Sequence, residues 1–260
     1  MFRLDNDTAY MSVGGECVFS CAYCYTLSPD YKIDSEQTIS EIIKEMADLK
    51  LDHNVKLVKL GCDSEIFANP AFASTLIEEI AKWGVDISFA TKQNLFDSTV
   101  EHLTETYEDM KKRNHELVAF VSLIGYATAK KIEKNVPSPE QRIETIVRLH
   151  NAGIPTFVYM KPMLPFVPTE EIDYVISQTE NHCIGFVIGD MISSSYYLKH
   201  LGVADLEKVG IPKWFSNGTK GDFFGYTDER IARYLQRDNF FATSNQAIAF
   251  VKEHMPVSLK

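Results

Sequence analysis

Apolar and polar residues alternate along this chain in a pattern that predicts strands followed by helices. The clearest helix spans about residues 36–51. Its apolar residues recur at the spacing of one buried helix face: Ile39, Ile42, Ile43, Met46 and Leu49. Apolar or β-branched runs predict strands at 10–13, 55–60, 85–91, 117–123, 154–160 and 184–188. Further helices are predicted at 71–83, 99–112, 139–152 and 169–179.

Strands and helices that alternate in this way imply an α/β fold with a parallel sheet and right-handed crossovers. A complete (β/α)8 barrel requires eight units, whereas this chain has six strand patterns. We therefore expect residues 1–190 to form a partial (β/α)6 TIM-type barrel. Reactive groups in such folds lie at the carboxyl ends of the strands, so those positions are the first to search for chemistry.

The pattern changes after Asp190. Residues 191–260 are rich in aromatic residues and glycines, with helices expected only near 228–237 and 245–254. We interpret this segment as a short aromatic-rich C-terminal cap that packs on the barrel. The alternative is ordinary core packing of the last two helices.

Composition narrows the class of protein. The chain has 260 residues, 45% of them hydrophobic, and a net charge of −10. This acidic balance does not favour a nucleic-acid partner, which usually needs a basic face, although a local basic groove would suffice. No apolar run is long enough to span a bilayer and no export signal precedes the first strand, so we expect a cytoplasmic protein without a membrane partner.

Three of the five cysteines lie within eight residues: Cys17, Cys21 and Cys24, in the spacing C-x3-C-x2-C. Three thiolates on one loop suit three irons of a [4Fe-4S] cluster, which usually takes four cysteines. The fourth iron would then be free to bind another molecule. The alternatives are a structural zinc site or an electron-transfer cluster, both of which need a further protein ligand.

This cysteine spacing, with Tyr23 directly before Cys24 and a strand directly before the loop, resembles the signature of the radical S-adenosylmethionine (radical SAM) superfamily. The resemblance implies that S-adenosylmethionine binds the open iron. An external one-electron donor, flavodoxin-like or ferredoxin-like, would drive its cleavage to a 5′-deoxyadenosyl radical, which abstracts hydrogen from a substrate. The alternative class is a non-catalytic iron–sulfur or zinc protein with a binding or electron-transfer role.

The ends of the later strands resemble the spore photoproduct lyase branch, also described as DNA repair photolyase-like. The segments that carry this likeness are 60–66, 89–92, 120–122 and 161–165. The resemblance implies that Ser64, Lys92 and Ser122 contact S-adenosylmethionine, as three polar groups at consecutive strand ends are able to do. The alternatives are a surface role for the lysine and strand-end caps for the serines.

Further site residues follow from the same resemblance. Tyr23 would border the adenine through its backbone, and the alternative for its ring is a place in the core. Glu133 and Arg142 would form an ion pair that shapes the cofactor pocket, or else a solvated surface pair. Cys62 would return a hydrogen atom to the product radical in a lyase-like reaction, whereas a free cysteine is more often a small buried side chain. The resemblance does not identify the substrate, which is a nucleic acid, a nucleotide, a peptide or another small molecule.

Overall fold

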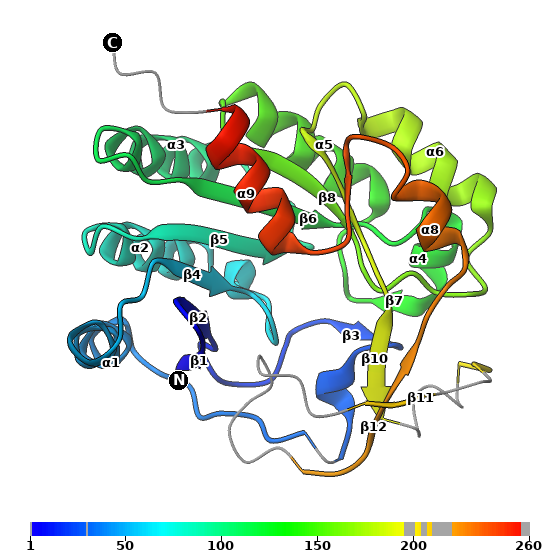
Figure 1. Cartoon of the computed structure of the whole chain (residues 1–260), viewed down its shortest axis with the longest axis horizontal. Helices are drawn as coiled ribbons and strands as arrows, with labels where there is room; N and C mark the ends of the chain where they lie inside the picture. Colours follow the sequence, from blue (N-terminus) through cyan, green and yellow to red (C-terminus); the bar gives the residue numbers. More distant parts are fainter. Residues whose placement is uncertain (1, 30, 195–200, 204–206, 210–219, 256–260) are drawn as a thin grey trace.

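The computed structural model describes residues 2–29, 31–194, 201–203, 207–209 and 220–255. Its centre is an eight-stranded sheet (Figure 1). In spatial order the strands are β1 (Phe2–Asp5), β2 (Thr8–Met11), β4 (Leu57–Leu60), β5 (Asp86–Thr91), β6 (Leu117–Ser122), β8 (Thr156–Met160), β9 (Gly185–Ile188) and β13 (Phe240–Phe241). All neighbours from β2 to β13 run parallel, and β1 is antiparallel to β2.

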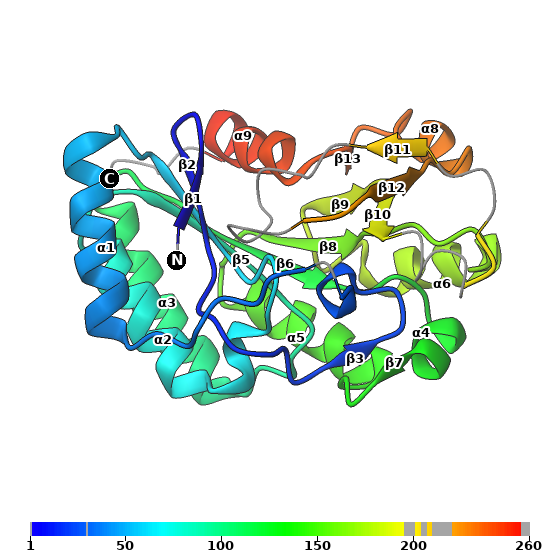
Figure 2. The ribbon, with the colours of Figure 1, turned by 90° about the horizontal axis from the view of Figure 1, so that it is seen from below.

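Helices that follow the strands cover one face of this sheet (Figure 2). They are α1 (Ile39–Asp52), α2 (Pro70–Ala81), α3 (Asp97–Lys111), α5 (Pro139–Asn151) and α6 (Thr169–Thr179). Thr38 and Ser138 begin α1 and α5 with capping boxes, which satisfy backbone N–H groups of the first turn. The apolar faces of these helices and the outward side chains of the strands form the main hydrophobic core.

The opposite face of the sheet is covered by α9 (Ser244–His254) (Figure 2). Ile248 and Val251 of this helix pack against Phe120 and Phe157 of the sheet. At the end of α9, Lys252 Nζ lies 2.6 Å from Asp86 Oδ2, at the start of β5. A short helix, α8 (Arg230–Tyr234), packs on the outer layer, where the Tyr234 hydroxyl donates a 2.8 Å hydrogen bond to Asp173 on α6.

Smaller elements lie near the carboxyl ends of the parallel strands (Figure 1). The short strands β3 (Ser20–Cys21) and β7 (Glu133–Lys134) pair antiparallel, and α4 (Ala127–Ile132) precedes β7. A second antiparallel sheet has the order β10 (Met191–Ser194), β12 (Phe223–Tyr226) and β11 (Glu207–Val209). Two 3-10 turns, η1 (Tyr25–Leu27) and η2 (Ile66–Ala68), follow β3 and β4 respectively.

The predicted α/β fold is confirmed, because all six predicted strands pair in parallel in chain order with helices between them. The prediction missed β1 and β13, which extend the sheet at its two edges. Within the described residues, no helix is both long and apolar enough to cross a membrane.

The predicted cap is described only in part, because 195–200, 204–206, 210–219 and 256–260 lie outside the described residues. Its described part contributes two things to the barrel: the packing of α8 and α9, and the small sheet β10–β12–β11. The division into a core of residues 1–190 and a cap of residues 191–260 stays a prediction.

Candidate active site

The loop after β2 carries the three clustered cysteines to the carboxyl ends of the strands. Cys21 is buried, whereas Cys17 and Cys24 are half-buried. The loop is anchored on β7, where Cys21 pairs with Glu133 in the ladder and the Ala22 N–H donates a 2.9 Å hydrogen bond to the Ile132 carbonyl. A turn with a 3.0 Å bond from the Cys24 N–H to the Cys21 carbonyl keeps these two cysteines close together.

The surroundings of the thiols suit metal ligation. Cys17 accepts backbone N–H bonds from Phe19 and Glu65, although burial still raises its pKa. Burial also raises the pKa of Cys21, to about 11, so a bound metal ion would have to supply the charge that deprotonates it.

The three cysteines of the loop suit a cluster with one open corner. In a cubane cluster each cysteine binds a different iron, so three thiols on one loop hold three of the four irons. A structural zinc site would need a fourth protein ligand beside these three cysteines. The donor set of the loop therefore fits a [4Fe-4S] cluster.

The end of β4 turns sharply into the site. Gly61 has φ +73°, and a Cβ atom there would lie 2.2 Å from the Ala90 carbonyl oxygen, so the turn requires glycine. Cys62 and Ser64 follow this turn. Among the described residues, Ser64 Oγ is a buried atom without a hydrogen-bond partner. A buried hydroxyl of this kind fits a site that is completed by a polar cofactor.

Glu65 joins the ends of β4 and β5. Its buried carboxylate accepts hydrogen bonds of 2.8 Å from Thr91 Oγ1, 2.8 Å from the Lys92 N–H and 3.1 Å from the Phe67 N–H. These bonds fix the backbone at Lys92. The Lys92 Nζ atom lies 5.5 Å from the centroid of the Tyr23 ring, so the lysine is directed toward the cysteine loop and is not a surface group.

The charge of Lys92 is stabilised by this position. Burial opposes the charge, but the attraction of Cys21, once ionised, and of the Glu133 carboxylate outweighs burial and raises the pKa of Lys92. The side chain therefore stays protonated at neutral pH. It offers a cation for a carboxylate such as that of S-adenosylmethionine.

Tyr23, Glu133 and Arg142 form one buried cluster. Arg142 Nη2 lies 2.6 Å from Glu133 Oε2, and both side chains are 1% exposed. The Tyr23 hydroxyl donates to Glu133 Oε1, and Arg142 Nη1 donates a 2.9 Å bond to the Ser122 carbonyl at the end of β6. The solvated surface pair is therefore excluded, and the Tyr23 ring belongs to the core.

Cys62 is half-buried directly after the β4 turn. The Tyr25 hydroxyl donates a hydrogen bond to its carbonyl oxygen, which ties the cysteine loop to the end of β4. Burial raises the pKa of the Cys62 thiol to about 11, with Lys59 opposing this change and Asp63 adding to it. Cys62 is therefore a thiol at neutral pH, which is the form that donates a hydrogen atom.

Neither the cysteine spacing nor the family resemblance predicted a role for Tyr25, Lys59 or the Glu65 carboxylate. A second buried network was also missed: Arg3 lies 3.4 Å from Asp34 Oδ2 and 3.1 Å from Asp63 Oδ2. The available indication was a charged residue within a short strand, alone among apolar residues at Lys59 and between Phe2 and Leu4 at Arg3. Such residues are buried only at a cost, so they suggest a partner or a ligand.

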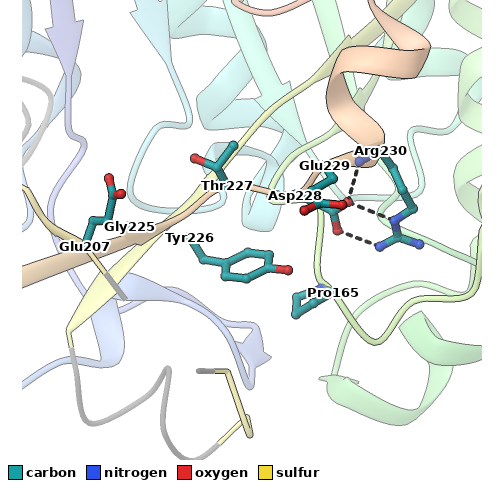
Figure 3. A pocket seen from close by; sticks show the side chains of 8 residues that line it. All are labelled: Pro165, Glu207, Gly225, Tyr226, Thr227, Asp228, Glu229 and Arg230. Carbon is teal, nitrogen blue, oxygen red and sulfur yellow. Dashed lines mark hydrogen bonds and ion pairs between the residues drawn. The ribbon is translucent and has the colours of Figure 1, made fainter. Parts of the chain in front are cut away.

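Two cavities open near these elements. One, of about 370 Å³, is lined by Cys17, Phe19, Tyr31 and Asp63 among others, and so adjoins the cysteine loop. The other, of about 430 Å³, lies between the small sheet and the loop after β8 (Figure 3). Arg230 is fixed at its edge by Asp228 Oδ2 at 2.7 Å and by the Leu164 carbonyl at 2.9 Å. The second cavity therefore marks where the cap meets the barrel.

Comparison with known proteins identifies the class. The family model of the radical SAM superfamily matches residues 11–178, which include the cysteine loop and the ends of β4, β5 and β6. The chain therefore belongs to the radical SAM superfamily. Enzymes of this superfamily use a [4Fe-4S] cluster and S-adenosylmethionine. Among curated proteins, no sequence matches this chain.

Solved structures share the fold at low sequence identity. Spore photoproduct lyase complexed with dinucleoside spore photoproduct is 14% identical, with a TM-score of 0.61 over 96% of this chain and 74% of that one. SuiB of Streptococcus suis bound to S-adenosylmethionine is 15% identical, with a TM-score of 0.57 over 76% of this chain. SuiB bound to its precursor peptide SuiA is 15% identical, with a TM-score of 0.55 over 71% of this chain. The matches span only 46% and 39% of the two SuiB chains.

Proposed function

We propose that this enzyme performs a lyase-like radical reaction in which Cys17, Cys21 and Cys24 hold the cluster and Cys62 returns a hydrogen atom to the product. The observation that carries the proposal is the turn after β4. It places a protonated thiol, Cys62, two residues from Ser64, whose buried hydroxyl has no partner among the described residues. The hydrogen donor Cys62 and the cofactor ligand Ser64 thus both follow the end of β4.

Three side chains would hold S-adenosylmethionine. Lys92 offers its ammonium to the cofactor carboxylate from the end of β5, and Ser64 and Ser122 offer hydroxyls from the ends of the flanking strands β4 and β6. Tyr23 borders the adenine with its backbone, since its ring is buried against Glu133. Glu133 and Arg142 contribute to the cofactor pocket by holding Tyr23 and the end of β6 in place.

Hydrogen return by Cys62 requires an external one-electron donor, which restores the thiol after each reaction. When bound, the cluster and S-adenosylmethionine supply a 5′-deoxyadenosyl radical that takes a hydrogen atom from a substrate C–H bond. After rearrangement, the product radical takes the hydrogen atom of the Cys62 S–H bond. The sulfur radical that remains is reduced to the thiol by one electron and one proton. A flavodoxin-like or ferredoxin-like protein would deliver the electron.

Anaerobic reconstitution tests the cofactor assignment. The protein should bind about four iron and four sulfide per chain, and dithionite should yield 5′-deoxyadenosine from S-adenosylmethionine. The Cys17→Ala variant should lose this product, whereas Cys183→Ala, a buried cysteine outside the site, should keep it. A fully ligated metal centre that releases no 5′-deoxyadenosine would support a non-catalytic iron–sulfur or zinc protein instead.

The Cys62→Ala variant tests hydrogen return. Once a substrate is in hand, the ratio of product to 5′-deoxyadenosine should fall by more than about tenfold, which corresponds to about 1.4 kcal/mol of transition-state stabilisation. The measurement is the amount of both compounds by chromatography under single-turnover conditions. An unchanged ratio would show that another group donates the hydrogen atom.

A further inference from the structure

Two lysines project into the interior of the barrel on the side away from the outer helices. Lys59, the third residue of β4, is 6% exposed, and its Nζ atom lies 5.5 Å from the ring centroid of Tyr10, its register partner on β2. Lys161 directly follows β8 and is half-buried. It packs closely on Gly189, where a Cβ atom would lie 2.7 Å from its Nζ atom. Both lysines thus come from the carboxyl ends of inner strands.

One short segment brings the two ammonium groups together. Lys59 Nζ donates a 2.8 Å hydrogen bond to Ser244 Oγ and a second bond to Asn245 Oδ1. Lys161 Nζ donates a 3.4 Å bond to the Ala242 carbonyl. Residues 242–245 lead into α9, so both lysines converge on the start of this helix.

These partners are neutral. Sixteen ion pairs join Lys, Arg or His to Asp or Glu in the described part of the chain, and none of them involves Lys59 or Lys161. Burial lowers the pKa of Lys59 to about 8, with Cys62 opposing this change and Lys161 adding to it. Burial likewise lowers the pKa of Lys161, which only the exposed Asp190 offsets. Two buried cations that repel each other are costly unless an anion joins them.

We propose that Lys59 and Lys161 bind an oxyanion group of the substrate, a phosphate or a carboxylate, so that the enzyme acts on an anionic substrate. The inference rests on the proposed function, because it places this group in the same interior as Cys62. Lys59 and Cys62 lie close enough to influence each other's charge, since Lys59 is near the carboxyl end of β4 and Cys62 lies two residues beyond that end. An anion held here fixes one end of the substrate, while the rest of it reaches the thiol and the cofactor ligands.

Binding of simple anions to the reconstituted protein tests this proposal directly. Isothermal titration with inorganic phosphate and with acetate, each against sodium chloride at equal ionic strength, should show binding of one of the two. Preference for phosphate indicates a phosphate ester as substrate, and preference for acetate indicates a carboxylate. The affinity should fall as the pH rises through about 8 and Lys59 loses its proton. The facing groups Tyr10 and Cys62, with pKa values raised to about 12 and about 11, stay neutral over this range.

Substitutions assign the binding to the two lysines. Lys59→Met and Lys161→Met should each weaken it by about tenfold or more, since a charge-assisted hydrogen bond contributes at least that much. Lys59→Arg keeps the charge and should retain most of the affinity, which separates loss of charge from loss of folding. Lys44→Met, at an exposed lysine on α1, is the matched control and should bind as the wild type does.

Two outcomes would overturn the proposal: wild-type protein that binds neither anion better than chloride, or binding that neither methionine variant weakens. Formation of 5′-deoxyadenosine by the wild-type protein is measured in parallel. Anion binding without this product leaves the oxyanion site standing and refutes the radical chemistry. Formation of 5′-deoxyadenosine without anion binding supports the radical chemistry and refutes the oxyanion site.

Discussion

At the scale of single residues, the candidate site depends on buried polar groups whose positions are fixed by several neighbours at once. Glu65 is the clearest case, because its carboxylate accepts three hydrogen bonds from β5 and from its own turn. A carboxylate with this many donors is held rigidly, even though burial raises its pKa. The Lys92 backbone is held in place as well, because its N–H is one of the three donors.

Lys92→Met should weaken binding of S-adenosylmethionine to the reconstituted protein by about 10- to 100-fold. The reason is the loss of one charge-assisted hydrogen bond, worth about 1.5–3 kcal/mol. Equilibrium dialysis with labelled cofactor under anaerobic conditions measures the change. Lys112→Met, at an exposed lysine that forms an ion pair with Asp109, is the control. An affinity that differs from wild type by less than about twofold would remove Lys92 from the cofactor site.

At the scale of elements, the paired strands β3 and β7 join the cysteine loop to the α4–β7 segment, and the Glu133–Arg142 pair extends this link to β6 and α5. These elements together therefore form one support for the cysteine loop. Removing one partner of a buried ion pair is costly, because the other charge is left without compensation in a medium of low dielectric constant.

Arg142→Met should accordingly lower the free energy of unfolding by about 3–5 kcal/mol. The matched control is Lys112→Met, which breaks an ion pair whose side chains are 72% and 69% exposed, and which should cost less than about 1 kcal/mol. Urea unfolding followed by circular dichroism measures both variants. Equal effects of the two substitutions would show that the buried pair does not support the fold.

The elements also show what a sequence pattern is able to predict. Helices such as α1 and strands such as β6 were predicted because their buried faces repeat over several turns or residues. The strands β3, β7 and β13 have only two residues each, which is too short for any period, and tertiary contacts alone decide their pairing. The hairpin β1–β2 turns at Asn6, whose φ is +57°, and this asparagine was the available indication.

In the candidate site too, features with a local sequence pattern were predictable and features set by tertiary contacts were not. Its cysteines were predictable because three ligands with fixed spacing lie within one short loop. Glu133 and Arg142 were placed together by the family resemblance, but nothing in the sequence indicated their burial. That burial arises from the turn between β7 and α5 and from the contact with Ser122, twenty residues away along the chain. The partners of Lys59 lie 185 and 186 residues from it, beyond the reach of any local pattern.

At the scale of the whole molecule, both faces of the sheet are covered and the chemistry is confined to one edge. The outer helices occupy one face and α9 the other (Figure 2). The described site residues come from the loop after β2 and from the ends of β4, β5 and β6. A ligand at this edge contacts several independent elements at once. Its binding free energy is therefore added to the stability of the whole barrel.

S-adenosylmethionine at about 100 times its dissociation constant should stabilise the cluster-loaded protein by about 2.7 kcal/mol. For a chain of this size, that corresponds to a rise of about 5–10 °C in the midpoint of thermal unfolding. Scanning calorimetry in an anaerobic cell measures it. The Cys17→Ala variant is the comparison, because it lacks one of the three cysteines that hold the cluster whose open iron anchors the cofactor, and its midpoint should rise by much less. An equal rise in both proteins would mean that the cofactor is held by the strand ends alone, without the cluster.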